Sequence, residues 1–253
     1  MKKIDLYNEF NKIIGKDNNL ISTIFKEIEK EEKKYIKNSK FLNYPIIYKS
    51  YYRFPEIKLP KPKNINIKLI DVLYKRKSTR EFSDRKIDIK TISALLYFSV
   101  GIKNINKKEN SRFYPSAGAR YPTEIYLIAN NTELNGKNSY LFHYYPLNHS
   151  LEKLWVIKKK ELRKIIFQNY FLKASVLVII SSFFLRMNIK YGYNKGFIYS
   201  ILEVGHVAQN FYLIGEALGL GVCEIGGFSL RYLNNLLDLP KEKEAPLIIM
   251  ALG

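Results

Sequence analysis

The sequence predicts an α+β domain that follows a helical N-terminal extension, and three observations lead to this prediction. Four apolar runs rich in β-branched and aromatic residues have the length and composition of β-strands. Between them lie segments whose apolar residues recur with the 3.6-residue period of an amphipathic helix. The chain has 253 residues, 47% of them hydrophobic, which is enough for one large core plus an extension.

The N-terminal extension is expected to be first helical and then extended. Apolar residues recur at helical spacing over residues 1 to about 40, with a break at residues 15–19. Residues 41–65 carry four prolines, which lack an amide N–H and restrict their neighbours. This segment is therefore expected to be an extended connector that its aromatic side chains fasten to a surface. We place the domain boundaries at residues 1–65 and 66–253.

The elements of the domain follow in order along the chain. A helix is expected to open near Leu69, and a second to cover residues 91–101 with Thr91 as its cap. A long helix is predicted over residues 197–218, where small residues such as Gly215 would let another helix approach closely. The predicted strands are residues 124–129, 140–144, 174–181 and 245–251.

Composition limits the classes of site and partner. The net charge of +19, from 42 Lys and Arg against 23 Asp and Glu, attracts anionic partners of any kind, although compositional drift also explains it. The single cysteine, Cys223, excludes an intrachain disulfide, and the three histidines lack metal-ligand spacing, so no metal site is expected. Because we find neither a signal peptide nor an apolar run of roughly 18 residues, we expect a cytoplasmic protein without a membrane partner.

The first segment with candidate binding residues follows the helix that opens near Leu69. Arg76, Ser78 and Arg80 alternate along the chain, so they face one side if the segment is extended. Guanidinium groups with forked donors and a short hydroxyl are suited to a phosphate. The same pattern is also typical of a solvated basic turn.

Two segments with small residues are the other candidates. Ser116, Ala117 and Gly118 precede a predicted strand, and their size lets the backbone approach a flat ligand closely. Gly226 and Gly227 follow the long helix and expose backbone N–H groups that could bind a phosphate or a polyol chain. Each segment alone is also typical of an ordinary turn.

Together and in this order, the motifs R-x-S-x-R, P-S-A-G-x-x-Y-P and A-L-G-L-G-V-C-E-I-G-G-F resemble those of the nitroreductase-like flavoproteins. The resemblance covers residues 44–253. Within that family the chain looks most like the SagB/ThcOx-type azoline dehydrogenases, which make thiazoles and oxazoles in modified peptides. The resemblance implies a nitroreductase-like α/β sandwich that forms an obligate homodimer with FMN at the subunit interface. It also implies a modified precursor peptide as substrate and a cyclodehydratase as partner.

The resemblance also assigns residues to the cofactor. The FMN-binding residues that it implies are Arg76, Ser78, Arg80, Ser116, Ala117, Gly118, Glu224, Ile225, Gly226 and Gly227. The first three match a motif that reaches the phosphate and the ring edge. The next three match the segment against the isoalloxazine, and the last four match a second flavin-contacting loop.

Lys190 and Tyr191 match the catalytic pair of the azoline branch. Burial or neighbouring cations lower the pKa of a lysine, so Lys190 is expected to act as the base or to activate it. Tyr191 is expected to carry or orient the proton, with its pKa lowered by the adjacent ammonium. Because neighbouring residues on a strand face opposite ways, we expect the pair in a loop or irregular turn before Gly192.

The chain departs from the pattern of this branch in three places. Ile198 stands where the branch usually has arginine, and the stretch from Tyr191 to His206 is one residue longer than usual. Many nitroreductases carry basic phosphate ligands after the final strand, and we find no counterpart of these ligands in the sequence. We therefore expect Arg76 and Arg80 to hold the phosphate. His206 is expected to be a hydrogen-bonded core or interface residue.

Two other functions remain open at this stage. The same fold and cofactor could reduce nitro groups, quinones or dehydroamino acids with NAD(P)H as the electron donor. Alternatively, the protein could be a non-catalytic scaffold or a basic nucleic-acid-binding protein, because aromatic and basic side chains interleave over residues 48–53. We favour peptide azoline oxidation, which needs no nucleic acid.

Overall fold

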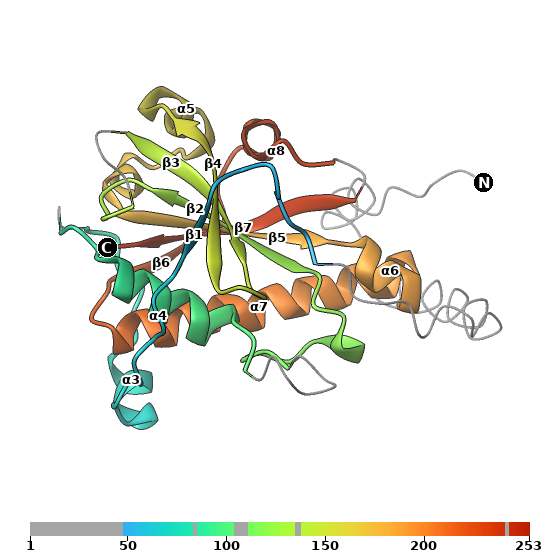
Figure 1. Ribbon diagram of the computed structural model, residues 1–253, viewed down its shortest axis with the longest axis horizontal. Coiled ribbons are helices and arrows are strands. Elements are labelled where there is room, and N and C mark those ends of the chain that lie inside the picture. The colour runs from blue at the N-terminus through green and yellow to red at the C-terminus, as the bar shows by residue number, and fades with distance from the viewer. Residues whose placement is uncertain (1–47, 83–84, 104–110, 135–137, 241–242) are drawn as a thin grey trace, which may run out of the picture.

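The computed structural model describes residues 48–82, 85–103, 111–134, 138–240 and 243–253. One β-sheet lies between two layers of helices (Figure 1). The helices predicted over residues 1 to 40 lie outside the described residues. The layered arrangement confirms the predicted α+β class.

Every strand pair in the seven-stranded sheet is antiparallel, and the strand order is β1-β4-β3-β2-β5-β7-β6. The strands are β1 Glu56–Lys58, β2 Thr123–Ala129, β3 Ser139–Tyr145, β4 Ser150–Ile157, β5 Val176–Phe183, β6 Val222–Ile225 and β7 Glu244–Leu252. The four predicted strands are confirmed as β2, β3, β5 and β7. The prediction lacks β1, β4 and β6 because β1 lies among prolines, β4 carries charged residues and β6 is very short.

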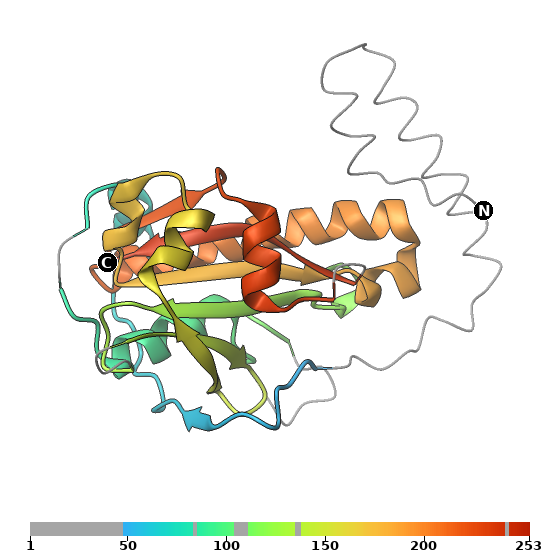
Figure 2. The ribbon, with the colours of Figure 1, turned by 90° about the horizontal axis from the view of Figure 1, so that it is seen from above.

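Helices cover both faces of the sheet (Figures 1 and 2). They are α3 Leu69–Lys75, α4 Ile89–Val100, α5 Lys159–Ile165, α6 Leu185–Tyr191, α7 Tyr193–Ala217 and α8 Leu230–Leu237. α4 and the long α7 lie on one face, whereas α5 and α8 lie on the other. α5, α6 and α8 are absent from the prediction because each has only seven or eight residues. None of the described helices combines the length and apolar character needed to cross a membrane.

The central strands are apolar on both faces because both faces are covered. On β2, Ile125 and Leu127 belong to the core under α4 and α7, whereas Tyr126 and Ile128 belong to the core under α5 and α8. Side chains of a strand alternate between faces, so two helical layers require two apolar sets. This explains why the central strands form continuous apolar runs in the sequence.

Two helix boundaries differ from the prediction. The cap of α4 is Asp88 and not Thr91, because the Asp88 carboxylate accepts hydrogen bonds from Thr91 N at 2.9 Å and Thr91 Oγ1 at 2.8 Å. The long helix begins at Tyr193, four residues earlier than predicted, directly after Gly192. Gly192 has a φ of 79°, a left-handed value that suits glycine and ends α6.

The connector is fixed to the domain from Lys49 onward. β1 pairs with β4, and Lys49 Nζ lies 2.6 Å from both Glu244 Oε2 and the Tyr126 hydroxyl. The ring of Tyr51 packs edge-on against Tyr126, with centroids 6.4 Å apart. The side chains of Lys49 and Tyr51 therefore point towards the domain and not towards solvent. The interleaved surface over residues 48–53, on which the nucleic-acid hypothesis depended, is interrupted.

α7 approaches β6 at Gly215. A Cβ atom at this position would overlap Cγ2 of Val222. The small residue therefore admits a strand against α7, and not a second helix as the sequence predicted. By contrast, a Cβ at Gly205 on the same helix would meet nothing within 4 Å.

We predict that Gly215→Ala lowers the free energy of unfolding by about 1–3 kcal/mol, the usual effect of overfilling a packed contact. Urea denaturation of the purified protein measures this change. Adding Val222→Ala removes the overlapping Cγ2 and is expected to reduce the additional loss caused by the alanine at 215. A Gly215→Ala protein as stable as the wild type would contradict the packing described here.

Candidate functional site

The segment with the first candidate residues runs extended beside β6, which meets the condition under which its alternate residues face one side. Ser78 forms a parallel bridge with Val222, and the backbone N–H of Thr79 donates to the Val222 carbonyl at 2.8 Å. This pairing brings the segment of Arg76 to Arg80 alongside the strand that ends in the Gly226-Gly227 loop. Two candidate segments that lie far apart in the sequence are therefore neighbours.

Tyr212 of α7 joins these two segments. Its hydroxyl lies 3.2 Å from Ser78 Oγ and accepts a 2.9 Å hydrogen bond from the backbone N–H of Glu224. The Arg76 guanidinium lies 5.3 Å from the centroid of its ring. We call this group the arginine end of α7. Its members are Arg76, Ser78, Arg80, Tyr212, Glu224, Ile225, Gly226 and Gly227.

The arginine end has the donors that an anionic ligand requires. Among the described residues, no ion pair involves Arg76 or Arg80, so neither guanidinium is neutralised by a carboxylate there. Gly226 and Gly227 are exposed, and a Cβ at Gly226 would meet nothing within 4 Å. Ile225 differs from the expectation for a contact residue, because it is buried in the core under α8.

The second group of candidates lies where α6 meets the turn of Ser116–Ala119. Gly118 has a φ of 57°, and a Cβ there would overlap both the Tyr191 hydroxyl and Lys190 Nζ. The two side chains therefore converge on the bare backbone of Gly118. We call Gly118, Lys190 and Tyr191, together with Ser116 and Ala117, the lysine end of α7.

Lys190 and Tyr191 are the last two residues of α6, and not part of a loop or irregular turn as predicted. Gly192 then ends the helix, and both side chains reach the facing turn at Gly118. Ser116 and Ala117 shape the facing turn: the Ser116 hydroxyl accepts a 2.8 Å hydrogen bond from the Tyr121 N–H, and Ala117 begins a single 3₁₀ turn.

The protonation of Tyr191 also differs from the prediction. Burial raises the pKa of Tyr191, and the neighbouring Tyr199 raises it further, while the charges of Arg120 and Lys195 oppose this only in part. The Tyr191 and Tyr199 rings pack edge to face with centroids 4.9 Å apart. The expectation of a phenol that loses its proton easily is therefore wrong. At neutral pH Tyr191 is a neutral phenol that can donate a hydrogen bond.

The two ends are separate within one chain. Tyr199 marks the lysine end and Tyr212 the arginine end, and the separation of thirteen positions along the helix spans about 20 Å. The surface of α7 between them is exposed and partly apolar: Ile201 is 45% exposed and Leu202 55% exposed. His206 is also exposed there, so it is not a core residue.

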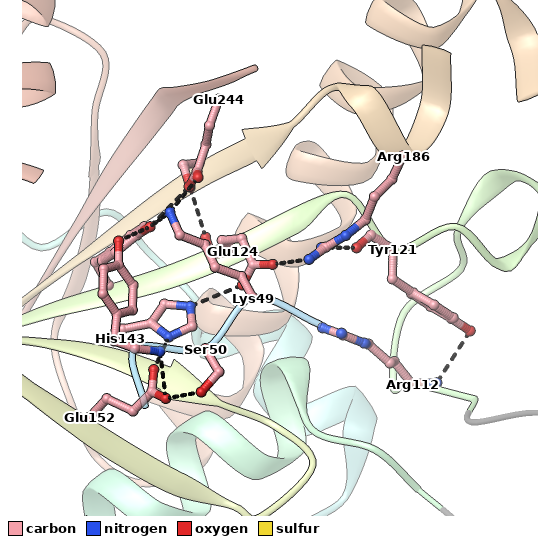
Figure 3. Close-up of polar contacts among 12 residues, drawn as sticks. Lys49, Ser50, Arg112, Tyr121, Glu124, His143, Glu152, Arg186 and Glu244 are labelled. Atoms are coloured by element: carbon pink, nitrogen blue, oxygen red, sulfur yellow. Dashed lines mark hydrogen bonds and ion pairs between the residues drawn. The ribbon is translucent and has the colours of Figure 1, made fainter. Parts of the chain in front are cut away.

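A buried set of charges crosses the sheet next to the lysine end (Figure 3). His143 of β3 lies between two carboxylates, with Nδ1 2.7 Å from Glu152 and Nε2 3.0 Å from Glu124. The other Glu124 oxygen accepts a hydrogen bond from Arg186 of α6. All four residues are less than 8% exposed, so the charges are largely removed from water.

Hydrogen bonds and ion pairs within this buried set decide which of its side chains are charged. Burial by itself would lower the pKa of His143, but the hydrogen bonds and charges of Glu124 and Glu152 raise it above its usual 6.5. Burial would raise the pKa of Glu124, but Arg186 and His143 outweigh it and lower that pKa to about 2. His143 is therefore an imidazolium between two carboxylates.

No motif in the sequence marks the residues Tyr212, Glu124, His143, Glu152 and Arg186 as candidates. A signal existed for the charged residues, because Glu124, His143 and Glu152 interrupt apolar strands. A charge inside such a strand is expensive to bury unless it is paired, so it indicates a partner on a neighbouring strand. No comparable signal marks Tyr212, which is one of many tyrosines in the chain.

The matching family pattern and a similar known protein both point to the nitroreductases. The sequence pattern of the nitroreductase family matches residues 73–253. The chain is 36% identical over 200 residues to a proposed nitroreductase of Methanocaldococcus jannaschii, an alignment that covers 78% of this chain and 96% of that protein. It is 28% identical over 178 residues to the microcin B17-processing protein McbC of Escherichia coli, covering 68% of this chain and 64% of the relative.

Solved structures share the fold. A proposed nitroreductase from Ralstonia eutropha has a TM-score of 0.68 at 24% identity, over 83% of this chain and 94% of that one. The Escherichia coli microcin synthetase McbBCD complex with truncated pro-MccB17 bound contains a chain with a TM-score of 0.61 at 25% identity, over 85% of this chain and 79% of that one.

We predict that His143 makes stability depend on pH above neutrality. A raised pKa in the folded state means that His143 stabilises the fold fully below its usual pKa of 6.5, and that this contribution is lost as the pH rises through the raised value. Urea denaturation from pH 6 to 9 is expected to show a decrease of at most about 1.4 kcal/mol per pH unit from this one proton. His143→Gln removes this decrease.

His149→Gln is the matched control. The ring of His149 bonds the Ser93 and Tyr144 hydroxyls, and burial lowers its pKa, which is the opposite direction. This variant is therefore expected to keep the alkaline decrease. Equal pH slopes in the wild type and His143→Gln would show that His143 is not charged between its two carboxylates.

Proposed function

The chain belongs to the nitroreductase family, and from this premise we propose that it is an FMN-dependent dehydrogenase that oxidises thiazolines or oxazolines of a ribosomally made peptide to thiazoles or oxazoles. The observation that carries the proposal is the convergence of Lys190 and Tyr191 on the backbone of Gly118. A general base and a neutral phenol that meet at a turn without a side chain suit proton removal from a planar ring.

FMN fits the residues that are present. At the arginine end, Arg76 and Arg80 offer guanidinium groups that form no ion pair within the described residues, and Ser78 offers a hydroxyl; these would hold the phosphate. The exposed backbone of Gly226 and Gly227 would bind the polyol chain. At the lysine end, Lys190 Nζ and the Tyr191 hydroxyl lie against the backbone of Gly118, where they would face a ring bound beside this turn. When bound, FMN supplies the acceptor for the hydride.

We propose that a homodimer unites the two ends. Gly205 and His206 lie midway between Tyr199 and Tyr212 on the exposed surface of α7. If two copies of α7 cross antiparallel at this midpoint, the arginine end of one subunit faces the lysine end of the other. The exposed apolar residues of α7 and the open space at Gly205 support this arrangement. Each FMN would then bind residues of both subunits.

The residues of the chain handle the proton. Azoline oxidation removes a proton and a hydride from adjacent ring carbons, a loss of about 2 Da. In this proposal Lys190 takes the proton from the ring carbon, and Tyr191 donates a hydrogen bond that orients the heterocycle. The raised pKa of Tyr191 suits this role, because a neutral phenol can donate whereas a phenolate cannot.

The peptide substrate and the partner are inferred from the relatives. One relative is named a microcin B17-processing protein, and one similar structure is a synthetase complex with a truncated pro-peptide bound. These likenesses support a modified precursor peptide as the substrate and a cyclodehydratase as the partner. The net charge of +19 suits an acidic peptide, since it raises the local concentration of anionic partners.

A second function has an observation in its favour. The 36% identity to a proposed nitroreductase favours reduction of a nitro group, a quinone or a dehydroamino acid with NAD(P)H as the donor. The two functions share FMN and differ in the direction of electron flow. Consumption of NAD(P)H without a peptide substrate would support the second function.

We predict that the purified protein is yellow and converts an azoline-containing peptide to the azole with oxygen as the final acceptor. Lys190→Ala is expected to lower kcat by about 100-fold or more, because a positioned base contributes 10²–10⁴-fold. Tyr191→Phe is expected to lower kcat less, because it removes one hydrogen bond. Mass spectrometry of the peptide and the flavin absorbance of each variant measure turnover and FMN content.

Lys195→Ala is the control, because Lys195 also lies near Tyr199 but follows Gly192 on α7. It is expected to keep turnover within about threefold. Full turnover in both Lys190→Ala and Tyr191→Phe would remove these residues from the mechanism while leaving the fold unchanged.

We also predict that Arg76→Gln raises the dissociation constant for FMN by about 10- to 100-fold, the cost of losing a charged hydrogen bond. Titration of the apoprotein with FMN, followed by flavin fluorescence, measures this change. Lys77→Gln removes the same charge from the exposed neighbour and is expected to change the constant by less than about threefold. Equal effects of the two substitutions would indicate general attraction of an anion and not a contact of Arg76.

A further inference from the structure

The geometry assigns Arg186 a positioning role: it fixes α6 against the turn of Gly118 and thereby holds Lys190 and Tyr191 at the site. This inference rests on the proposed function for the roles of Lys190 and Tyr191. The positioning itself rests on contacts of Arg186 with two different parts of the fold.

Arg186 connects α6 to both sides of the lysine end. Its Nη1 donates a 2.8 Å hydrogen bond to the Tyr121 carbonyl, and its Nη2 donates to Glu124. Tyr121 ends the turn that contains Gly118, three residues earlier. Lys190 follows Arg186 by one helical turn. One guanidinium therefore ties the helix of the catalytic pair to the backbone on which that pair converges.

The Glu124 carboxylate has no freedom to follow a displaced Arg186. Its second oxygen is held by His143 Nε2 at 3.0 Å, and His143 Nδ1 is held by Glu152 at 2.7 Å. Glu152 in turn accepts hydrogen bonds from Ser50 Oγ at 2.6 Å and Tyr51 N at 2.8 Å. A continuous chain of paired groups thus runs from the connector through three strands to α6 (Figure 3).

The forked shape of arginine is what this position requires. Two donors of one planar group reach a carboxylate on β2 and a carbonyl of the turn. A lysine has the same charge but a single compact ammonium, which cannot reproduce both contacts in that geometry. Arg186→Lys is therefore expected to preserve the buried charge balance and the fold while loosening α6.

Hydrogen exchange of the purified full chain tests the positioning without any assumed chemistry. We expect Arg186→Lys to raise the amide exchange rate of peptides that cover residues 185–191 by about tenfold or more, with no comparable change in residues 89–100 of α4. Arg112→Lys is the matched control. Arg112 is equally buried, but its described side-chain hydrogen bond goes to Tyr114 and not to α6. Unchanged exchange in α6 of Arg186→Lys would overturn the inference.

Turnover of the FMN-loaded enzyme tests the consequence for the catalytic pair. Arg186→Lys is expected to lower kcat by about 10- to 100-fold, the effect of a misplacement near 1 Å, with KM changed by less than about threefold. In a Lys190→Ala background the same substitution is expected to cost less than about twofold, because the group that it positions is already absent. Independent losses that multiply in the double variant would overturn the positioning role.

The two tests separate this inference from the proposed function. If the wild-type enzyme oxidises no azoline but exchange in α6 rises in Arg186→Lys, the proposed function fails and the contact of Arg186 with the turn stands as the device that holds α6. If azoline oxidation is found but Arg186→Lys leaves both exchange and kcat unchanged, the proposed function stands and the positioning role fails.

Discussion

The carboxylate of Glu124 is the contact on which the arrangement of the lysine end depends. One of its oxygens holds Arg186 of α6 and the other holds His143 of β3. Removing such charges from water costs several kcal/mol per ion, and only close pairing offsets this cost. A displaced α6 would leave Glu124 with an unpaired oxygen and Arg186 with an unpaired charge inside the protein. Electrostatic pairing therefore restricts the position of α6 relative to β2.

α7 determines the spacing between the two groups of candidate residues. A helix of 25 residues is rigid over this distance, so Tyr199 and Tyr212 keep a constant separation. The packing of β6 against Gly215 keeps the arginine end in register with the helix. The candidate residues are spread over some 150 positions of the sequence. In the fold they form two groups, one near each of these two tyrosines of α7. In the proposed homodimer, symmetry has to relate only these two groups.

The sequence predicted the parts of the fold that local patterns determine. The apolar runs of β2, β5 and β7 stand out because helices cover both faces of these strands, and α4 and α7 have clear helical periodicity. The sequence did not predict β4 because Glu152 and Lys153 break its apolar run. The charge of Glu152 is explained only by its partner His143 on β3. The sequence did not predict α6 because the helix is short. Its position also depends on a contact between Arg186 and Glu124, which lie 62 positions apart in the sequence.

The candidate site was predictable to a similar extent. The alternation of Arg76, Ser78 and Arg80 pointed to one shared face only on the condition that the segment is extended, and its pairing with β6 meets that condition. The same reasoning could not find Tyr212, since its role depends on where α7 passes the segment. It also gave the wrong direction for the pKa of Tyr191, because burial and the facing Tyr199 are properties of the folded chain. Local patterns thus indicated the candidate residues, and long-range packing decided which side chains surround them and whether they are protonated.

The backbone pairing of Ser78 and Thr79 with β6 also protects an edge of the sheet. β6 is the last strand on its side, and an uncovered edge strand offers free N–H and C=O groups to other chains. The segment that presents Arg76 and Ser78 occupies part of this edge, while the opposite edge ends in β1 with only three residues. The residues that we propose to hold the FMN phosphate therefore also shield part of this edge. Substitutions in this segment can uncover the edge and reduce solubility as well as the proposed binding, which couples the evolution of the two properties.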